Sequence, residues 1–228
     1  MTTSSTIQEL QICRIKFPEI KLQTRDAHKL RGYFGNLFKE HSPILHNHYE
    51  DGRLRYKYPS IQYKVIDNVP TLIGINDGAE LLPTLFLKIK ELDINGQKFS
   101  INTKNIELKS EKAGYSNSLH EYKFTTLWMG LNQTNYTRYL KLKSEVEKQD
   151  MLNAILVGHV LSFFRNTGLE LNANERLMAK VNVVEKSTQF KENKMIAFSG
   201  SFIVNALLPD EIGLGKSVSR GFGTIKRN

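Results

Sequence analysis

The chain has 228 residues, of which 40% are apolar and 24% charged, a composition typical of a globular protein with one large domain or two small ones. Its 32 Lys and Arg residues outnumber 23 Asp and Glu residues, and the net charge of +9 suits a polyanionic partner. The single cysteine, Cys13, excludes a disulfide framework and a cysteine zinc cluster, and neither a secretory signal nor an apolar run near the ~20 residues of a membrane span is visible. The sequence therefore predicts a cytoplasmic protein without membrane association.

The first half of the chain alternates between strand and helix patterns. Residues 9–17 alternate apolar and polar side chains and predict a strand. The elements expected next are a helix capped by Thr24, strands over 53–66 and 69–75 joined by a turn at Asp67-Asn68, a helix near Asp77, and a strand over 98–108. Pro83 fits only the first turn of a helix, so this second helix is expected to begin after Asp77. The order is that of a ferredoxin-like unit.

The second half repeats this order after a polar stretch, 110–120, which predicts a linker. The elements expected are a strand over 121–131 that contains Trp128, an ambiguous 132–142 that permits a short helix, a long helix capped by Ser144 and Glu147, strands over 178–186 and 194–207, one helical turn at 209–212 and a strand over 222–227. The sequence therefore predicts an α+β protein of two tandem ferredoxin-like (RRM-like) βαββαβ domains, residues 1–112 and 118–228.

A glycine-rich segment, residues 213–223, precedes the last predicted strand. Gly213 and Gly215 flank one apolar residue, Gly221 and Gly223 flank another, and Lys216 and Arg220 lie between the two pairs. Glycine accepts positive φ and lets another backbone approach, so the N–H groups of such a loop can converge on one anion. The spacing does not fit a Walker loop, and a dinucleotide fingerprint belongs early in a domain. The alternative is a tight turn into a strand.

A second candidate site lies after the first predicted helix, where His46 and His48 stand two residues apart. On an extended backbone both side chains project to the same side. Metal-free RNA cleavage needs a base to remove the 2′-hydroxyl proton and an acid to protonate the 5′-oxygen. Imidazole suits both roles because its unperturbed pKa lies near the pH of the cytoplasm. Cations that could stabilise the phosphate charge follow closely: Arg53, Arg55, Lys57 and Lys64.

Other interpretations of the histidines remain open at this point. Each could be an ordinary surface residue. The pair could also bind zinc or manganese, with His41 or Asp51 as a third ligand. His159, on the apolar stripe of the long helix, is interpreted as a hydrogen-bonded core histidine.

The doubled glycine pattern resembles the C-terminal loop of the repeat-associated (RAMP) CRISPR proteins, and within that group the CRISPR repeat-processing endoribonucleases of the Cas-six family. The run Leu45-His-Asn-His-Tyr49 is similar to the branch of this family that carries an H-x-H pair. The resemblance implies His46 and His48 as catalytic residues and Tyr56 and Lys57 as weaker supporting candidates. The residues expected to bind RNA are Gly213, Gly215, Lys216, Arg220, Gly221, Gly223, Arg53 and Arg55.

We therefore expect a metal-independent endoribonuclease that cuts CRISPR precursor RNA within its repeats and leaves a 2′,3′-cyclic phosphate and a 5′-hydroxyl. No cofactor and no metal are expected. The partner is the repeat precursor transcript, while a homodimer and association with a CRISPR effector complex are left open. Two alternatives are a non-catalytic RAMP subunit that holds guide RNA and a basic protein-interaction module without an RNA role.

Overall fold

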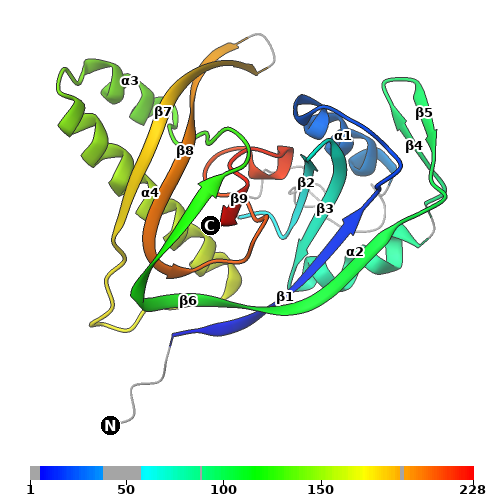
Figure 1. Cartoon of the computed structure of the whole chain (residues 1–228), viewed down its shortest axis with the longest axis horizontal. Helices are drawn as coiled ribbons and strands as arrows, with labels where there is room; N and C mark the ends of the chain where they lie inside the picture. The colour runs from blue at the N-terminus through cyan, green and yellow to red at the C-terminus, as the bar shows by residue number, and fades with distance from the viewer. Residues whose placement is uncertain (1–5, 38–57, 88, 191–192) are drawn as a thin grey trace, which may run out of the picture. The chain divides into compact units, whose positions relative to one another are not determined.

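The computed structural model describes residues 6–37, 58–87, 89–190 and 193–228 (Figure 1). The contacts within the chain divide it into two units. The N-terminal unit comprises Glu9–Glu111 with Val218–Gly221, and the C-terminal unit comprises 112–217 and 222–228 with the residues up to Gln8. Both contain helices packed on an antiparallel sheet, so the protein is α+β as predicted.

The N-terminal unit has the element order and strand order of a ferredoxin-like fold. Its strands lie in the order β2-β3-β1-β6. Its elements are β1 (Gln8–Lys16), η1 (Thr24–Asp26), α1 (Ala27–Leu37), β2 (Ile61–Ile66), β3 (Val69–Ile75), α2 (Asp77–Phe86), the hairpin of β4 (Glu91–Ile94) and β5 (Gln97–Ser100), and the first part of β6 (Asn105–Phe124).

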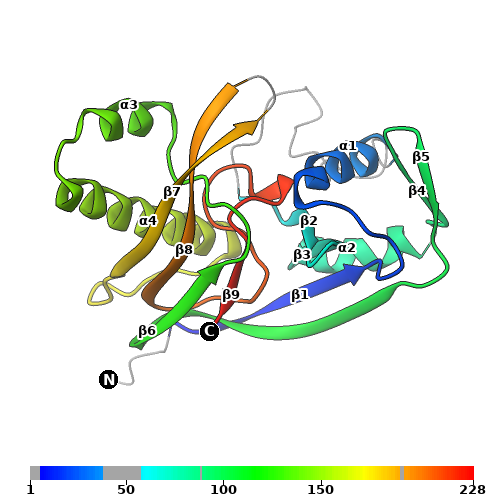
Figure 2. The same ribbon diagram turned by 45° about the horizontal axis from the view of Figure 1, so that its top comes forward.

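Both helices of the N-terminal unit cover one face of its sheet. One core cluster contains Leu30 and Phe34 of α1, Leu82 of α2 and Cys13 and Ile15 of β1. Burial raises the pKa of the Cys13 thiol to about 11, which agrees with a small core residue. The β4–β5 hairpin lies beside α1 (Figure 2), and the Tyr33 hydroxyl donates a hydrogen bond to the carbonyl of Glu91.

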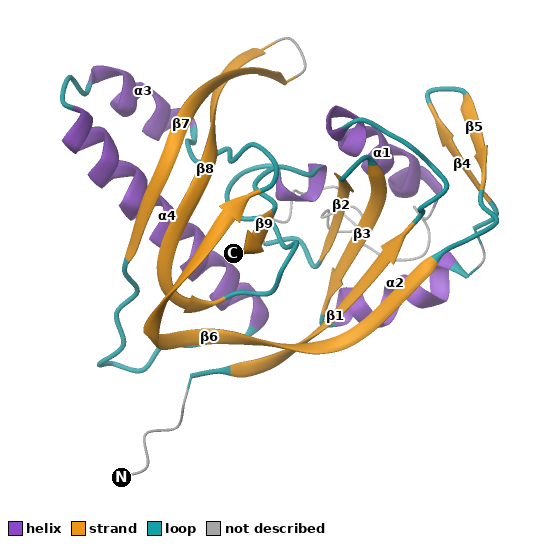
Figure 3. Ribbon diagram, in the orientation of Figure 1, coloured by secondary structure: helices purple, strands orange, loops and turns teal. Residues whose placement is uncertain are grey.

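The C-terminal unit repeats the arrangement. Its strands lie in the order β7-β8-β6, with β9 paired to the other side of β6. Its elements are the second part of β6, α3 (Gln133–Lys141), α4 (Glu145–Thr167), β7 (Ala179–Phe190), β8 (Asn193–Leu207) and β9 (Ile225–Arg227). The helix α4 runs along β7 (Figure 3). The two halves are therefore tandem ferredoxin-like units, and β6 supplies the last strand of one and the first strand of the other.

The predicted linker over 110–120 is wrong, because these residues belong to the continuous strand β6 (Figure 3). Polar side chains there are mostly exposed, and the pairing of β6 with β8 shifts register between Tyr115 and His120. Gly114, within this stretch, has φ +143 and lies against the backbone of Thr6 and Ile7, where a Cβ would collide. The division of the chain at 112 and 118 stays a prediction.

The start expected for α2 is also wrong. The helix begins at Asp77 and keeps Pro83 in its interior, where one helical hydrogen bond is lost. Fully buried side chains of Ala79 and Leu82 hold the helix on the sheet and outweigh this loss. Thr24 is likewise not the cap of the first helix, because it lies inside η1 and the N-cap position is Gln23.

The single strand expected over 98–108 is wrong, because its first residues belong to β5 in the separate two-stranded β4–β5 sheet and β6 begins only at Asn105. Other boundaries within the described residues differ by several residues. Asp67 and Asn68 form the predicted turn, with φ of 50° and 64°. Trp128 lies outside β6 and makes an isolated bridge to Phe198, and residues 209–212 form a turn without a helix. In the described part of the chain, no helix combines the length and apolar character needed to cross a membrane.

Candidate functional site

The catalytic candidates from the sequence fall in residues 38–57, outside the described residues. This applies to His46, His48, Arg53, Arg55, Tyr56 and Lys57. Their roles stay predictions. Among the cations expected near them, Lys64 lies in β2 and is fully buried, as is its neighbour Gln62. The Gln62 side chain donates a 2.8 Å hydrogen bond to the hydroxyl of Tyr58, the first described residue after 57.

The glycine-rich loop is bound closely to the backbone of the C-terminal unit. The N–H of Leu214 donates to the carbonyl of Gly223 at 2.8 Å, and the N–H of Gly223 donates to Leu127 at 2.8 Å. The N–H of Lys216 donates to the carbonyl of Met129 at 2.9 Å. These three donors are occupied within the protein, so the expected convergence of the loop's N–H groups on an anion cannot include them.

Two of the loop glycines are required by the backbone itself. Gly215 has φ +100, and a Cβ there would lie 2.8 Å from both the Met129 carbonyl oxygen and Trp128 Nε1. Gly223 has φ +63, and its Cβ would collide with the carbonyl oxygen of Leu214. Both positions therefore exclude a side chain for conformational and steric reasons. These two glycines therefore shape the loop, and the side chains of Lys216 and Arg220 are its charged groups for contact with an anion.

The side chain of Trp128 packs against the loop at Gly215. Its ring stacks on Phe124 at 5.2 Å, and its Nε1–H donates to Nδ1 of His159 at 3.3 Å. Burial, with a smaller contribution from the charge of Lys216, lowers the pKa of His159 to about 4. The imidazole is therefore a neutral acceptor near pH 7, as expected for a core histidine, and not a general acid. Sequence reasoning noted Trp128 only as a strand residue.

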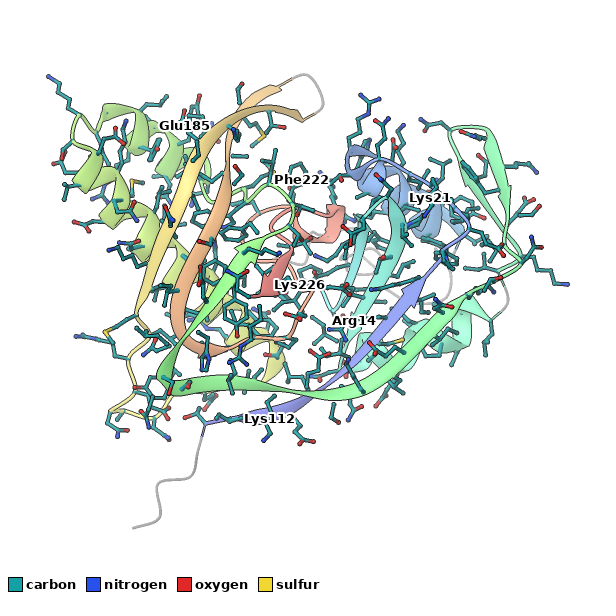
Figure 4. The ribbon with its side chains drawn as sticks, viewed as in Figure 1. Arg14, Lys21, Lys112, Glu185, Phe222 and Lys226 are labelled. Carbon is teal, nitrogen blue, oxygen red and sulfur yellow. The ribbon has the colours of Figure 1, made fainter. Side chains whose placement is uncertain are left out.

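The cationic residues of the loop have different surroundings. Lys216 is exposed, and Arg220 is half-buried. In the strand β9 that follows the loop, Lys226 and Arg227 are exposed (Lys226 and the loop residue Phe222 are labelled in Figure 4). The loop and the strand after it thus carry four basic side chains, which suits a polyanion.

The middle of the loop, Val218–Gly221, belongs to the N-terminal unit. Its η3 turn (Val218–Arg220) packs on α1 and β2. A Cβ at Gly221 would lie 2.6 Å from the Cβ of Ala27, the first residue of α1, and 3.4 Å from the carbonyl oxygen of Tyr63 in β2. This close approach brings Arg220 near Arg31 of α1, and the two charges interact. Arg31 was not a candidate from the sequence.

Two tandem ferredoxin-like units and a glycine-rich terminal loop with basic side chains define a protein of the RAMP class. Comparison with known families identifies the family within this class. The family model of the Cas6b N-terminal domain matches residues 8–112, and that of the Cas6b C-terminal domain matches residues 114–228. The chain belongs to the Cas6b family.

Solved structures agree with this assignment. A crystal structure of Cas6b is 34% identical, covers 97% of this chain and 100% of its own, and has a TM-score of 0.91. A structure described as the CRISPR RNA processing endoribonuclease Cas6b is 31% identical with the same coverage and a TM-score of 0.78. An uncharacterized protein of Methanocaldococcus jannaschii is 35% identical over 144 residues, which is 63% of this chain and 96% of that protein. A Cas6 product complex, at 12% identity and a TM-score of 0.60, shares the fold alone.

Proposed function

We propose that this protein is an endoribonuclease that processes CRISPR precursor RNA within its repeats. The observation that carries the proposal is the match to Cas6b over both units, together with similarity to a structure described as a CRISPR RNA processing endoribonuclease. The net charge of +9 and the basic loop are consistent with an RNA substrate.

We assign the chemistry to His46 and His48. One imidazole removes the proton of the 2′-hydroxyl, which attacks the adjacent phosphorus. The other imidazole protonates the departing 5′-oxygen, so the products are a 2′,3′-cyclic phosphate and a 5′-hydroxyl. Each positioned proton transfer contributes on the order of 10²–10⁴ in rate, and no metal is required. Tyr56 and Lys57 are supporting residues that stabilise charge on the phosphate.

RNA binding is assigned to basic side chains in two places. Arg53 and Arg55 follow the histidines in the sequence, and Lys216 and Arg220 belong to the glycine-rich loop. The loop glycines act indirectly, since they allow the backbone to pack on Trp128 and present the two basic side chains. Affinity should therefore fall steeply with salt concentration.

The test uses the intact protein and a transcript of the CRISPR repeat from the same genome. Cleavage should persist in EDTA, and it should stop when the nucleotide before the cut carries 2′-deoxyribose. The double variant of His46→Ala and His48→Ala should bind the RNA without cutting it. His28→Ala is the matched control, because His28 is exposed on α1 and should leave cleavage unchanged.

Three outcomes would contradict the mechanism. Loss of cleavage in EDTA would indicate a required metal ion. Cleavage by the double variant would exclude His46 and His48 as the catalytic residues. Cleavage of the deoxy substrate would exclude attack by the 2′-hydroxyl. Salt-sensitive binding of the repeat by the unaltered protein, without any cleavage, would indicate a RAMP subunit that only holds guide RNA.

A further inference from the structure

Two arginines from distant parts of the sequence meet within the N-terminal unit. Arg31 is on α1, one turn after Ala27, and is half-buried. Arg220 is the last residue of η3, which packs on α1 and β2. The close approach of Gly221 to Ala27 and to the Tyr63 carbonyl fixes the backbone beside Arg220 against the start of the same helix. The fold itself therefore holds the two guanidinium groups near each other.

Both guanidinium groups are half-buried, and each acts on the other's charge. Burial, and after it the nearby charge of Arg220, lowers the pKa of Arg31. A guanidinium remains protonated at any physiological pH, so both side chains keep their positive charge. Like charges held close by a fold are stabilised when an anion lies between them, and arginine pairs with phosphate through two parallel hydrogen bonds.

A third polar group accompanies the arginines. The hydroxyl of Tyr63 is buried and has no hydrogen-bond partner among the described residues. Burial raises the pKa of this hydroxyl, and the nearby charge of Arg31 offsets a smaller part of that rise. An unpaired buried hydroxyl usually costs stability unless another group satisfies it. Tyr63 is nevertheless fully buried and stacks on Phe34, so it lies on the core side of Arg31 and is not itself open to a phosphate.

We infer that Arg31 and Arg220 together bind one phosphate of the RNA backbone. The inference rests on the proposed function and adds to it a residue, Arg31, and a shared phosphate site. Arg31 is a binding and positioning residue; the acid and base remain the histidines. A phosphate held by two arginines on α1 and η3 fixes the path of the RNA strand across this part of the N-terminal unit.

The experiment measures binding of a repeat transcript that carries 2′-deoxyribose before the cut site, so that binding is separated from cleavage. Arg31→Gln and Arg220→Gln should each weaken binding by roughly 10-fold or more, since each removes a charged hydrogen bond. Each should also reduce the slope of log Kd against log salt by up to about 0.7. The double variant should lose little more than either single variant, because both arginines serve one phosphate.

Two variants serve as controls. Arg165→Gln removes the same charge from an exposed position on α4 and should change the affinity less than about 2-fold. Arg31→Lys keeps the charge but loses the paired hydrogen bonds, so its affinity should fall between those of the unaltered protein and Arg31→Gln. Thermal unfolding checks that each variant is folded. If Arg31→Gln does not fold, Arg31→Lys and Arg220→Gln still decide the question.

The outcomes separate the inference from the proposed function. If the unaltered protein neither binds nor cuts the repeat, the proposed function fails. If it cuts the repeat but Arg31→Gln and Arg31→Lys bind with unchanged affinity and salt slope, the phosphate site is wrong and the function stands. Losses that add fully in the double variant would show that the arginines bind different phosphates, which would overturn the shared site.

Discussion

Gly223→Ala tests whether the glycine-rich loop is as crowded as the structure indicates. An alanine at φ +63 pays about 1–2 kcal/mol for a left-handed backbone. The Cβ of this alanine would also collide with the carbonyl oxygen of Leu214, so Leu214 must move. The movement weakens the 2.8 Å hydrogen bond from the Leu214 N–H to the carbonyl of residue 223, at a cost of about 1 kcal/mol or more. The expected total loss is about 2–4 kcal/mol in the free energy of unfolding.

Gly168→Ala is the matched control for this change. Gly168 ends α4 with φ +80, and a Cβ there would meet no atom within 4 Å. The Gly168→Ala variant should therefore lose only the about 1–2 kcal/mol that a left-handed alanine backbone costs. Urea unfolding of both variants gives the steric part as the difference between the two losses. Equal losses would refute the idea that Gly223 is required by close packing as well as by its backbone angle.

Two further predictions concern buried ionisable side chains. The pKa of folded His159 is about 4, below the usual value near 6.5, so the unfolded chain binds more protons between these pH values. The contribution of neutral His159 to the free energy of unfolding is complete above pH 6.5 and falls by at most about 3 kcal/mol toward pH 4. The variant His159→Gln should therefore show a flatter dependence of unfolding free energy on pH between these values. An unchanged pH profile would contradict the lowered pKa of His159. Arg14, only 5% exposed and labelled in Figure 4, pairs with Glu111 and with the more exposed Glu107. Glu111→Gln should cost about 2 kcal/mol in urea unfolding and Glu107→Gln less than about 1 kcal/mol; the reverse order would show that burial does not decide the strength of these pairs.

Hydrophobic periodicity predicted most of the strands and helices, and it failed where exposure or pairing masked the pattern. The middle of β6 is polar because much of it is exposed, and this polarity resembled that of a linker. The β4–β5 hairpin was missed, although Asn95-Gly96 is a strong signal for a tight turn, with φ of 57° and 81°. The strands on either side of this turn have only four residues each, which is too short to show a clear alternating pattern.

The position of the glycine-rich loop could be predicted from spacing, but its internal bonding could not. The N–H groups of Lys216 and Gly223 bond to the carbonyls of Met129 and Leu127, which flank Trp128 and are remote in the sequence. The same limit applies to Arg31. It stands on a helix face among other basic residues, and only the packing of η3 on α1 distinguishes it from them.

The occupied backbone donors of the loop have a consequence for selectivity. Rigid amide groups could form hydrogen bonds to the edge of a base at a fixed angle, whereas lysine and arginine side chains bind the phosphates of the strand regardless of its nucleotide sequence. A loop of this kind would tolerate many repeat sequences of suitable shape. Discrimination between one repeat and another would then have to come from other surfaces of the protein or from the folded form of the transcript.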